Sequence, residues 1–160
     1  MSYRAAIFDF DGTLVDTMPH HFEAYRRVLA TEGIELAPET FFASIGGIAR
    51  ETIPKLLRGA DCRLSVAEIH AAKQQTVGKL FADEPPPALE TSKLLPVFHG
   101  QLRMAIASSG SRAGIEQILA ALDWMHYFDA IIAGEDAAQG KPAPDLFLLA
   151  AERLGVRPSE

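Results

Sequence analysis

The sequence is poor in cysteine, in basic residues and in long apolar runs. Its 160 residues hold one cysteine, Cys62, which excludes an internal disulfide and fits a reducing compartment. Lysine and arginine total 15 against 21 acidic residues, and a net charge of −6 without a basic block argues against a nucleic-acid partner. No apolar run reaches the roughly 20 residues of a membrane span, and the apolar stretch near the start, broken by Asp9, is too short for a signal peptide, so we expect neither. We expect a cytoplasmic protein with neither nucleic-acid nor membrane partners.

The composition is that of an ordinary globular protein, with 48% hydrophobic and 22% charged residues. Buried strands are predicted at residues 5–8, 104–107 and 128–133, the first of them buried on both faces. Strands that alternate with helices favour an α/β fold, a Rossmann-like parallel sheet with right-handed crossovers. Caps and apolar periodicity predict helices over residues 17–33, 38–44, 50–58, 65–81, 89–98, 111–122 and 144–154.

The helices of the first half form a block of their own in the sequence. Residues 16–88 are predicted to be all-helical and end in a stiff Asp-Glu-Pro-Pro-Pro connector. We therefore predict a discontinuous α/β core, residues 1–15 and 89–160, with an inserted helical domain at 16–88.

The first predicted strand runs into two acids and a glycine. Asp9 and Asp11 stand at alternate positions and so leave the backbone on the same side, and Gly12 permits a sharp turn. Two carboxylates at the end of a buried strand are costly without a cation. Mg²⁺, which prefers oxygen ligands, is the natural candidate, with Asp9 and Asp11 as its ligands.

This stretch has two alternative interpretations. In the first, the pattern arises by chance at the end of a strand, and the two acids only cap a turn. An EF-hand loop is excluded, because it needs glycine sixth and glutamate twelfth, whereas Gly12 is fourth and His20 is twelfth.

Two further polar residues follow predicted strands. Ser108 precedes a helix, where a hydroxyl and free N–H groups can bind an anion, although plain helix capping is the alternative. Lys141 lies between Gly140 and Pro142, where the backbone is fixed; the alternative is a solvated surface charge. The segment 134–141 is not a P-loop, because it has one residue too many and a proline where a metal-binding hydroxyl belongs.

Residues 9–16, Asp-Phe-Asp-Gly-Thr-Leu-Val-Asp, resemble the first motif of the haloacid-dehalogenase-like hydrolases. Ser108 matches the second motif of that family, and Lys141, in a Lys-Pro-x-Pro-Asp setting, matches the third. The resemblance implies that Asp9 is a nucleophile that forms an aspartyl-phosphate and that Asp11 is the general acid–base. It also implies that Ser108 and Lys141 hold the phosphoryl group.

The helical insert resembles the cap domain of the subgroup that contains β-phosphoglucomutase and fructose-1-phosphatase-like sugar phosphatases. Thr17, His21 and Arg50 match cap-side positions, and Lys73 is a looser match. The alternatives are a packed imidazole for His21 and a solvated charge for Arg50. The substrate contacts that the resemblance implies are Gly12, Thr17, His21, Gly47, Arg50 and Ser109.

The family pattern continues beyond residue 160 into a strand that ends in paired acids, a fourth motif that this sequence lacks. We therefore expect a fragment or a degenerate member, with weak metal affinity, low activity and self-association through an exposed edge at residues 5–10. The complete form is expected to be a Mg²⁺-dependent phosphatase of a small phosphorylated metabolite, in particular a sugar phosphate. The alternatives are a phosphomutase and a non-catalytic protein.

Overall fold

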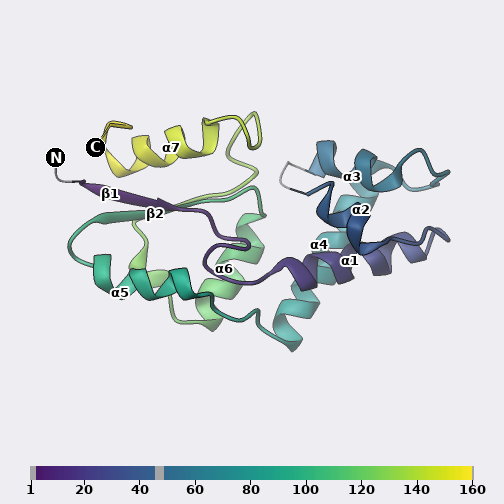
Figure 1. Cartoon of the computed structure of the whole chain (residues 1–160), viewed down its shortest axis with the longest axis horizontal. Helices are drawn as coiled ribbons and strands as arrows, with labels where there is room; N and C mark the ends of the chain where they lie inside the picture. Colours follow the sequence, from purple (N-terminus) through teal and green to yellow (C-terminus); the bar gives the residue numbers. More distant parts are fainter. Residues whose placement is uncertain (1–2, 46–48, 160) are drawn as a thin grey trace.

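A parallel β-sheet joins three strands that are far apart in the sequence and forms the centre of one half of the molecule (Figure 1). The computed structural model describes residues 3–45 and 49–159, and within them the sheet has the order β1-β2-β3. Strand β1 (Ala5–Phe8) pairs in parallel with β2 (Arg103–Ala107), which pairs in parallel with β3 (Ala130–Ile132). The predicted α/β class is confirmed. Among residues 3–45 and 49–159, none of the helices combines the length and the hydropathy that a membrane span needs.

Helices cover both faces of the sheet. On one face lies α7 (Asp145–Leu154), and on the other lie α5 (Leu94–Phe98) and α6 (Arg112–Ala121) (Figure 1). Strand β2 shows why, because its side chains alternate between the two layers. Ala105 and Ala107 pack with α7, while Met104 and Ile106 join the cluster that contains α6 residues.

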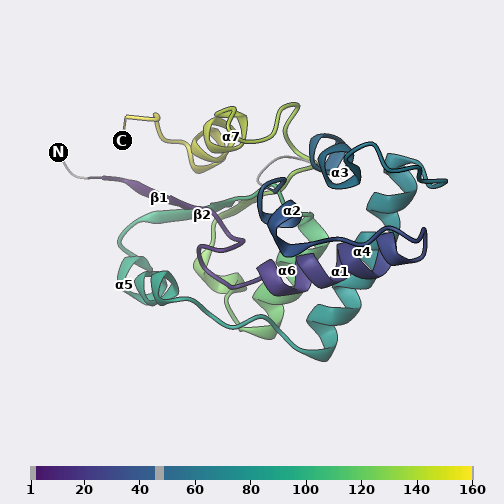
Figure 2. The ribbon, with the colours of Figure 1, turned by 45° about the vertical axis from the view of Figure 1, so that its right-hand side comes forward.

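The remaining helices gather beyond the carboxyl ends of the strands (Figures 1 and 2). They are α1 (Met18–Ala30), α2 (Pro38–Phe42), α3 (Ala49–Leu57) and α4 (Val66–Asp83). These helices share an apolar cluster of their own, built from Tyr25, Val28, Leu29, Leu36, Phe41, Ile53, Leu56 and Ile69.

Helix α4 links this block to the sheet. It begins at a capping box, in which Ser65 and Glu68 satisfy each other's backbone N–H groups. Its later residues Val77 and Phe81 belong to the apolar cluster under the sheet, and Gln117 of α6 donates to the carbonyl of Gly78 at 2.9 Å. The block is therefore anchored to the core through the second half of α4.

The chain enters and leaves the helical block at adjacent places. The Asp16 N–H donates to the Pro87 carbonyl at 2.9 Å, and the Leu89 N–H donates to the Leu14 carbonyl at 2.9 Å. These two bonds hold the two crossing segments side by side.

Three predicted elements differ from the structure. Strand β1 is not buried on both faces: Ala5, Ala6 and Ile7 are half-buried, because β1 is an edge of the described sheet. The strand predicted at 128–133 is shortened to 130–132, since the Asp129 carboxylate accepts from the Met104 N–H at the point where a ladder would start. The helix predicted at 89–98 is split into a 3-10 helix, η1 (Glu90–Lys93), and α5.

Candidate active site

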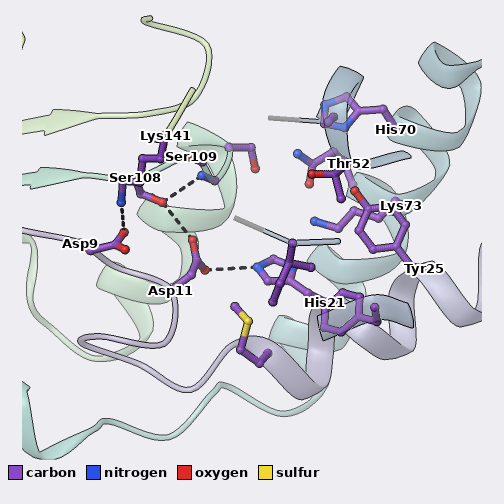
Figure 3. Close-up of a pocket in the computed structure, with 17 residues that line it drawn as sticks. Asp9, Asp11, His21, Tyr25, Thr52, His70, Lys73, Ser108, Ser109 and Lys141 are labelled. Atoms are coloured by element: carbon purple, nitrogen blue, oxygen red, sulfur yellow. Dashed lines mark hydrogen bonds and ion pairs between the residues drawn. The ribbon is translucent and has the colours of Figure 1, made fainter. Parts of the chain in front are cut away.

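A cavity of about 240 Å³ lies at the carboxyl ends of the strands, between the sheet and the helical block (Figure 3). This is where ligands bind in open parallel sheets. Loops of the sheet side contribute Asp9, Asp11, Ser108, Ser109, Gly110, Ser111 and Lys141 to its lining. The helical block contributes Met18, His21, Tyr25, Phe41, Ile45, Ala49, Thr52, His70, Lys73 and Gln74.

Asp9 is the more open of the two carboxylates. Its Oδ1 accepts from the Phe10 N–H at 2.8 Å and lies 2.6 Å from the Lys141 ammonium. Its Oδ2 accepts no hydrogen bond from the described residues, and the side chain is 37% exposed. Asp9 thus combines one oxygen held beside a cation with a second oxygen that is free to meet a ligand.

Asp11, in contrast, is held on every side. Its Oδ1 accepts from the Thr17 hydroxyl at 2.7 Å and from His21 Nε2 at 3.2 Å, and its Oδ2 accepts from the Ser108 hydroxyl at 2.9 Å. Burial alone would raise the pKa of Asp11, but the hydrogen bonds from His21, Thr17 and Ser108 lower it well below its ordinary value. Asp11 is ionised in this arrangement.

His21 supplies its bond to Asp11 as a neutral donor. Burial, and then the charge of Lys73, lower the pKa of His21 although Asp11 acts in the opposite direction. A neutral ring that donates through Nε2 leaves Nδ1 as an acceptor, and Nδ1 is buried without a partner among the described residues.

The loop after β2 has the features of an anion site. Ser108 Oγ accepts from the Gly110 N–H at 2.9 Å while it donates to Asp11. The N-cap of α6 is Ser111, whose side chain accepts from the Gly114 N–H, so Ser108 is not the helix cap. The Ser109 hydroxyl is buried without a hydrogen-bond partner among the described residues. This donor is left available to a ligand.

Gly110 allows this loop to approach Asp11. A Cβ at this position would lie 2.9 Å from Asp11 Oδ2 and 3.1 Å from Ser108 Oγ. Any side chain here would push apart the two groups whose hydrogen bond orders the site.

The helical block presents polar groups to the same cavity. Lys73 is only 8% exposed, and its ammonium lies 5.4 Å from the ring centroid of Tyr25. Burial lowers the pKa of Lys73 to about 8 although the charge of Asp11 opposes this, and burial raises the pKa of Tyr25 to about 12. His70 and Thr52 lie nearby (Figure 3).

The structure brings together most of the predicted site residues. Asp9, Asp11, Ser108, Lys141, His21 and Ser109 all line the cavity. Thr17 is fully buried and reaches the cavity only through Asp11.

Three predicted residues are placed elsewhere or lie outside the description. Gly12 has a φ of +71° and donates its N–H to the Val15 carbonyl, so it shapes the turn without lining the cavity. Arg50 donates to the Ala138 carbonyl at 2.8 Å. Gly47 lies outside the described residues.

Sequence reasoning missed Tyr25, Thr52, His70 and Gln74. The available signal was the spacing of His70, Lys73 and Gln74, which places three polar side chains on one face of a helix.

The donor chemistry of the site fits a magnesium ion. Among the described residues no group of three His, Cys, Asp or Glu side chains could hold a metal. Mg²⁺ is, however, commonly held by one or two carboxylates together with water and substrate phosphate. Asp9 would bind through its free Oδ2, and Asp11 would bind by sharing an oxygen that already accepts hydrogen bonds.

The chain is similar in sequence to known phosphatases. The chain is 34% identical over 160 residues to fructose-1-phosphate phosphatase YqaB of Escherichia coli, covering 99% of this chain and 84% of that protein. It is 33% identical to a phosphorylated carbohydrates phosphatase of Thermotoga maritima, covering 98% and 73%.

A solved structure extends the likeness to the fold. The crystal structure of CbbY from Rhodobacter sphaeroides in complex with phosphate superposes with a TM-score of 0.89 at 28% identity, covering 99% of this chain and 75% of that one. The model of the haloacid dehalogenase-like hydrolase family matches residues 3–160. The chain therefore belongs to the haloacid dehalogenase-like hydrolases.

Proposed function

We propose that the protein is a phosphatase that hydrolyses small sugar phosphate monoesters through an aspartyl-phosphate. The observation that carries this proposal is the Asp9 carboxylate, which is open to the cavity through Oδ2 while Oδ1 lies 2.6 Å from Lys141. Two relatives that align over nearly the whole chain are named as phosphatases of fructose 1-phosphate and of phosphorylated carbohydrates.

In the first half of the reaction, an Asp9 oxygen attacks phosphorus and the bond from phosphorus to the sugar oxygen breaks. Lys141, Ser108 and the Ser109 hydroxyl, which has no partner among the described residues, stabilise the charge on the phosphoryl oxygens. Asp11 gives its proton to the departing oxygen. In the second half, Asp11 takes a proton from water, the water oxygen attacks phosphorus, and inorganic phosphate leaves as the Asp9 carboxylate is restored. Bound Mg²⁺, held by Asp9 and Asp11, would reduce the repulsion between carboxylate and phosphate.

Asp11 must acquire a proton before it acts as an acid. In the structure its low pKa depends in part on the Ser108 hydroxyl. A phosphoryl group that takes this hydroxyl for itself removes one hydrogen bond from Asp11 and brings negative charge near it. Both changes raise the pKa of Asp11, whereas a Mg²⁺ ion held by this carboxylate would lower it, so Asp11 acts as an acid only where the first two effects prevail.

The helical block at residues 16–88 acts in this proposal as a cap that binds the part of the substrate not transferred. Tyr25, Thr52, His70 and Lys73 offer hydroxyl, imidazole and ammonium groups, which suit the hydroxyl groups of a sugar. Thr17 and His21 orient Asp11, while Arg50, through Ala138, ties the block to the loop that carries Lys141. Gly12 shapes the turn beside the site, and Gly47 is assigned a substrate contact by the family resemblance alone.

A screen of sugar phosphates with Mg²⁺, in which released inorganic phosphate is measured, tests the proposal. Asp9→Asn is the control, and hydrolysis that survives in this variant contradicts the covalent mechanism. With β-glucose 1-phosphate, an isomerised sugar phosphate in place of free phosphate would show a phosphomutase. Absence of turnover, of Mg²⁺ binding and of phosphate binding would show a non-catalytic protein.

Self-association through the edge of β1 stays a prediction. Size-exclusion chromatography over a range of protein concentrations tests it.

A further inference from the structure

The loop after β2 and the loop after β3 are joined at their backbones. The Gly134 N–H donates to the Gly110 carbonyl at 2.8 Å. The approach is so close that a Cβ on Gly134 would lie 2.5 Å from the Ser109 carbonyl oxygen. Ser108 and Lys141 therefore lie on two loops whose backbones are in direct contact.

Arg112, the first residue of α6, fastens the second loop from the side. Its Nη2 donates to the Asp136 carboxylate at 2.6 Å and to the Ile131 carbonyl at 3.0 Å. The same Asp136 oxygen accepts from the Ala133 N–H at 2.8 Å. The Arg112 backbone N–H lies 3.2 Å from both carboxylate oxygens of Glu135. One residue of the first loop's helix thus holds the end of β3 and the first turn beyond it.

This arrangement matters because of the distance that the second loop must bridge. Strand β3 ends at Ile132, and Lys141 comes nine residues later with no helix or strand between them. Lys141 must nevertheless bring its ammonium to 2.6 Å from Asp9. Fixing the first turn of the loop at Asp136 shortens the segment before Lys141, which Arg50 also holds at the Ala138 carbonyl, and lowers the entropy lost when Lys141 reaches its position.

An exposed ion pair alone would contribute little, and Arg112 and Asp136 are 41% and 29% exposed. The Arg112–Asp136 pair differs from an isolated ion pair because both side chains also bind the backbone. Arg112 binds a backbone carbonyl as well as the carboxylate, and that carboxylate binds a backbone N–H in turn, so the backbone of the loop is held through both groups.

From these contacts we infer that Arg112 is a positioning residue, which sets the place of Lys141 by clamping the loop at Asp136. The part of this inference that concerns activity rests on the proposed function. Arg112 is not among the described residues that line the cavity.

The test compares Arg112→Met and Arg112→Lys with Glu116→Gln. Glu116 is a matched control, because it faces the same guanidinium at 3.6 Å but belongs to α6 and makes no hydrogen bond or ion pair with the described residues of the loop. With p-nitrophenyl phosphate as substrate, Arg112→Met is expected to lower kcat by about 10- to 100-fold while KM changes by less than about threefold, because Lys141 acts on the transition state. Arg112→Lys restores part of kcat, and Glu116→Gln leaves both constants unchanged.

Hydrogen exchange of the backbone amides separates this inference from the proposed function. Arg112→Met is expected to speed exchange at residues 134–141 and to leave the amides of β1 and β2 unchanged, whether or not the wild type is a phosphatase. Exchange at 134–141 equal to that of Glu116→Gln overturns the inference. A uniform rise over the whole core also overturns it, because Arg112 would then only stabilise the fold.

Discussion

His21 Nε2 lies 3.2 Å from Asp11 Oδ1, and this contact joins the first helix of the helical block to the second acid of the sheet side. The neutral imidazole donates and the carboxylate accepts, although both groups are largely removed from water. The protonation state of the site and the position of the helical block are therefore linked.

The depressed pKa of Asp11 predicts a dependence of stability on pH. Because this pKa lies below its ordinary value of 3.8, the unfolded chain binds more protons in acid than the folded protein does. The ionised form stabilises the fold above about pH 4. That contribution is lost as the pH falls further.

We expect the free energy of unfolding of Asp11→Asn to fall less than that of the wild type between pH 5 and pH 2. Urea unfolding at a series of pH values measures the difference. Asp61→Asn, at an exposed carboxylate, should follow the wild type. Equal slopes for Asp11→Asn and the wild type would contradict the prediction.

The lowered pKa of Lys73 predicts that stability also depends on pH in the alkaline range. Its pKa of about 8 in the folded protein lies below the ordinary 10.5, so the unfolded chain binds more protons between these values. The free energy of unfolding should therefore rise with pH across this window, by up to about 3 kcal/mol from this group.

Lys73→Met should be more stable than the wild type at pH 7 and should lose the rise toward pH 10. Lys79→Met, at an exposed lysine of the same helix, is the matched control and should keep the rise. Urea unfolding between pH 7 and pH 10 gives both values, and a Lys73→Met variant that keeps the rise would refute the assignment.

Gly134 and Gly78 make a contrasting pair of alanine substitutions. A Cβ at Gly134 would lie 2.5 Å from a backbone carbonyl oxygen, which cannot move without displacing the loop that carries Ser108. We expect Gly134→Ala to cost about 1–3 kcal/mol of stability and to lower kcat.

At Gly78, inside α4, the nearest atom to a Cβ would be the Gln117 side-chain oxygen at an ordinary 3.7 Å. Gly78→Ala should therefore raise stability by about 0.5–1 kcal/mol and leave kcat unchanged. Thermal melting and steady-state kinetics on both variants check the pair, and a Gly134→Ala protein as stable as the wild type would show that the loop yields.

The sequence predicted the sheet side of the site well, because the chemistry there follows strand ends. Asp9 and Ser108 directly follow short apolar runs, and Lys141 lies on the loop after the third run, nine residues beyond Ile132. Parallel strands bring such ends to one edge of the sheet. The site residues of the helical block were harder to predict from the sequence. Tyr25 and His70 lie on helices whose orientation depends on how α4 packs against α6, a contact between residues about 40 positions apart.

The ends of the elements were also set by distant groups. The third strand was predicted two residues too early, because Asp129 turns its carboxylate to Met104 on the neighbouring strand. No local pattern around residue 128 carries that information.

The paired crossings at Asp16–Pro87 and Leu14–Leu89 have a mechanical consequence. Two segments that are bonded to each other cannot swivel independently, so any rotation of the helical half relative to the sheet must bend both at the same level. The second half of α4, which packs in the apolar cluster of the core and accepts a bond from Gln117, is a third attachment. The two crossings and α4 together therefore limit how far the mouth of the cavity can widen.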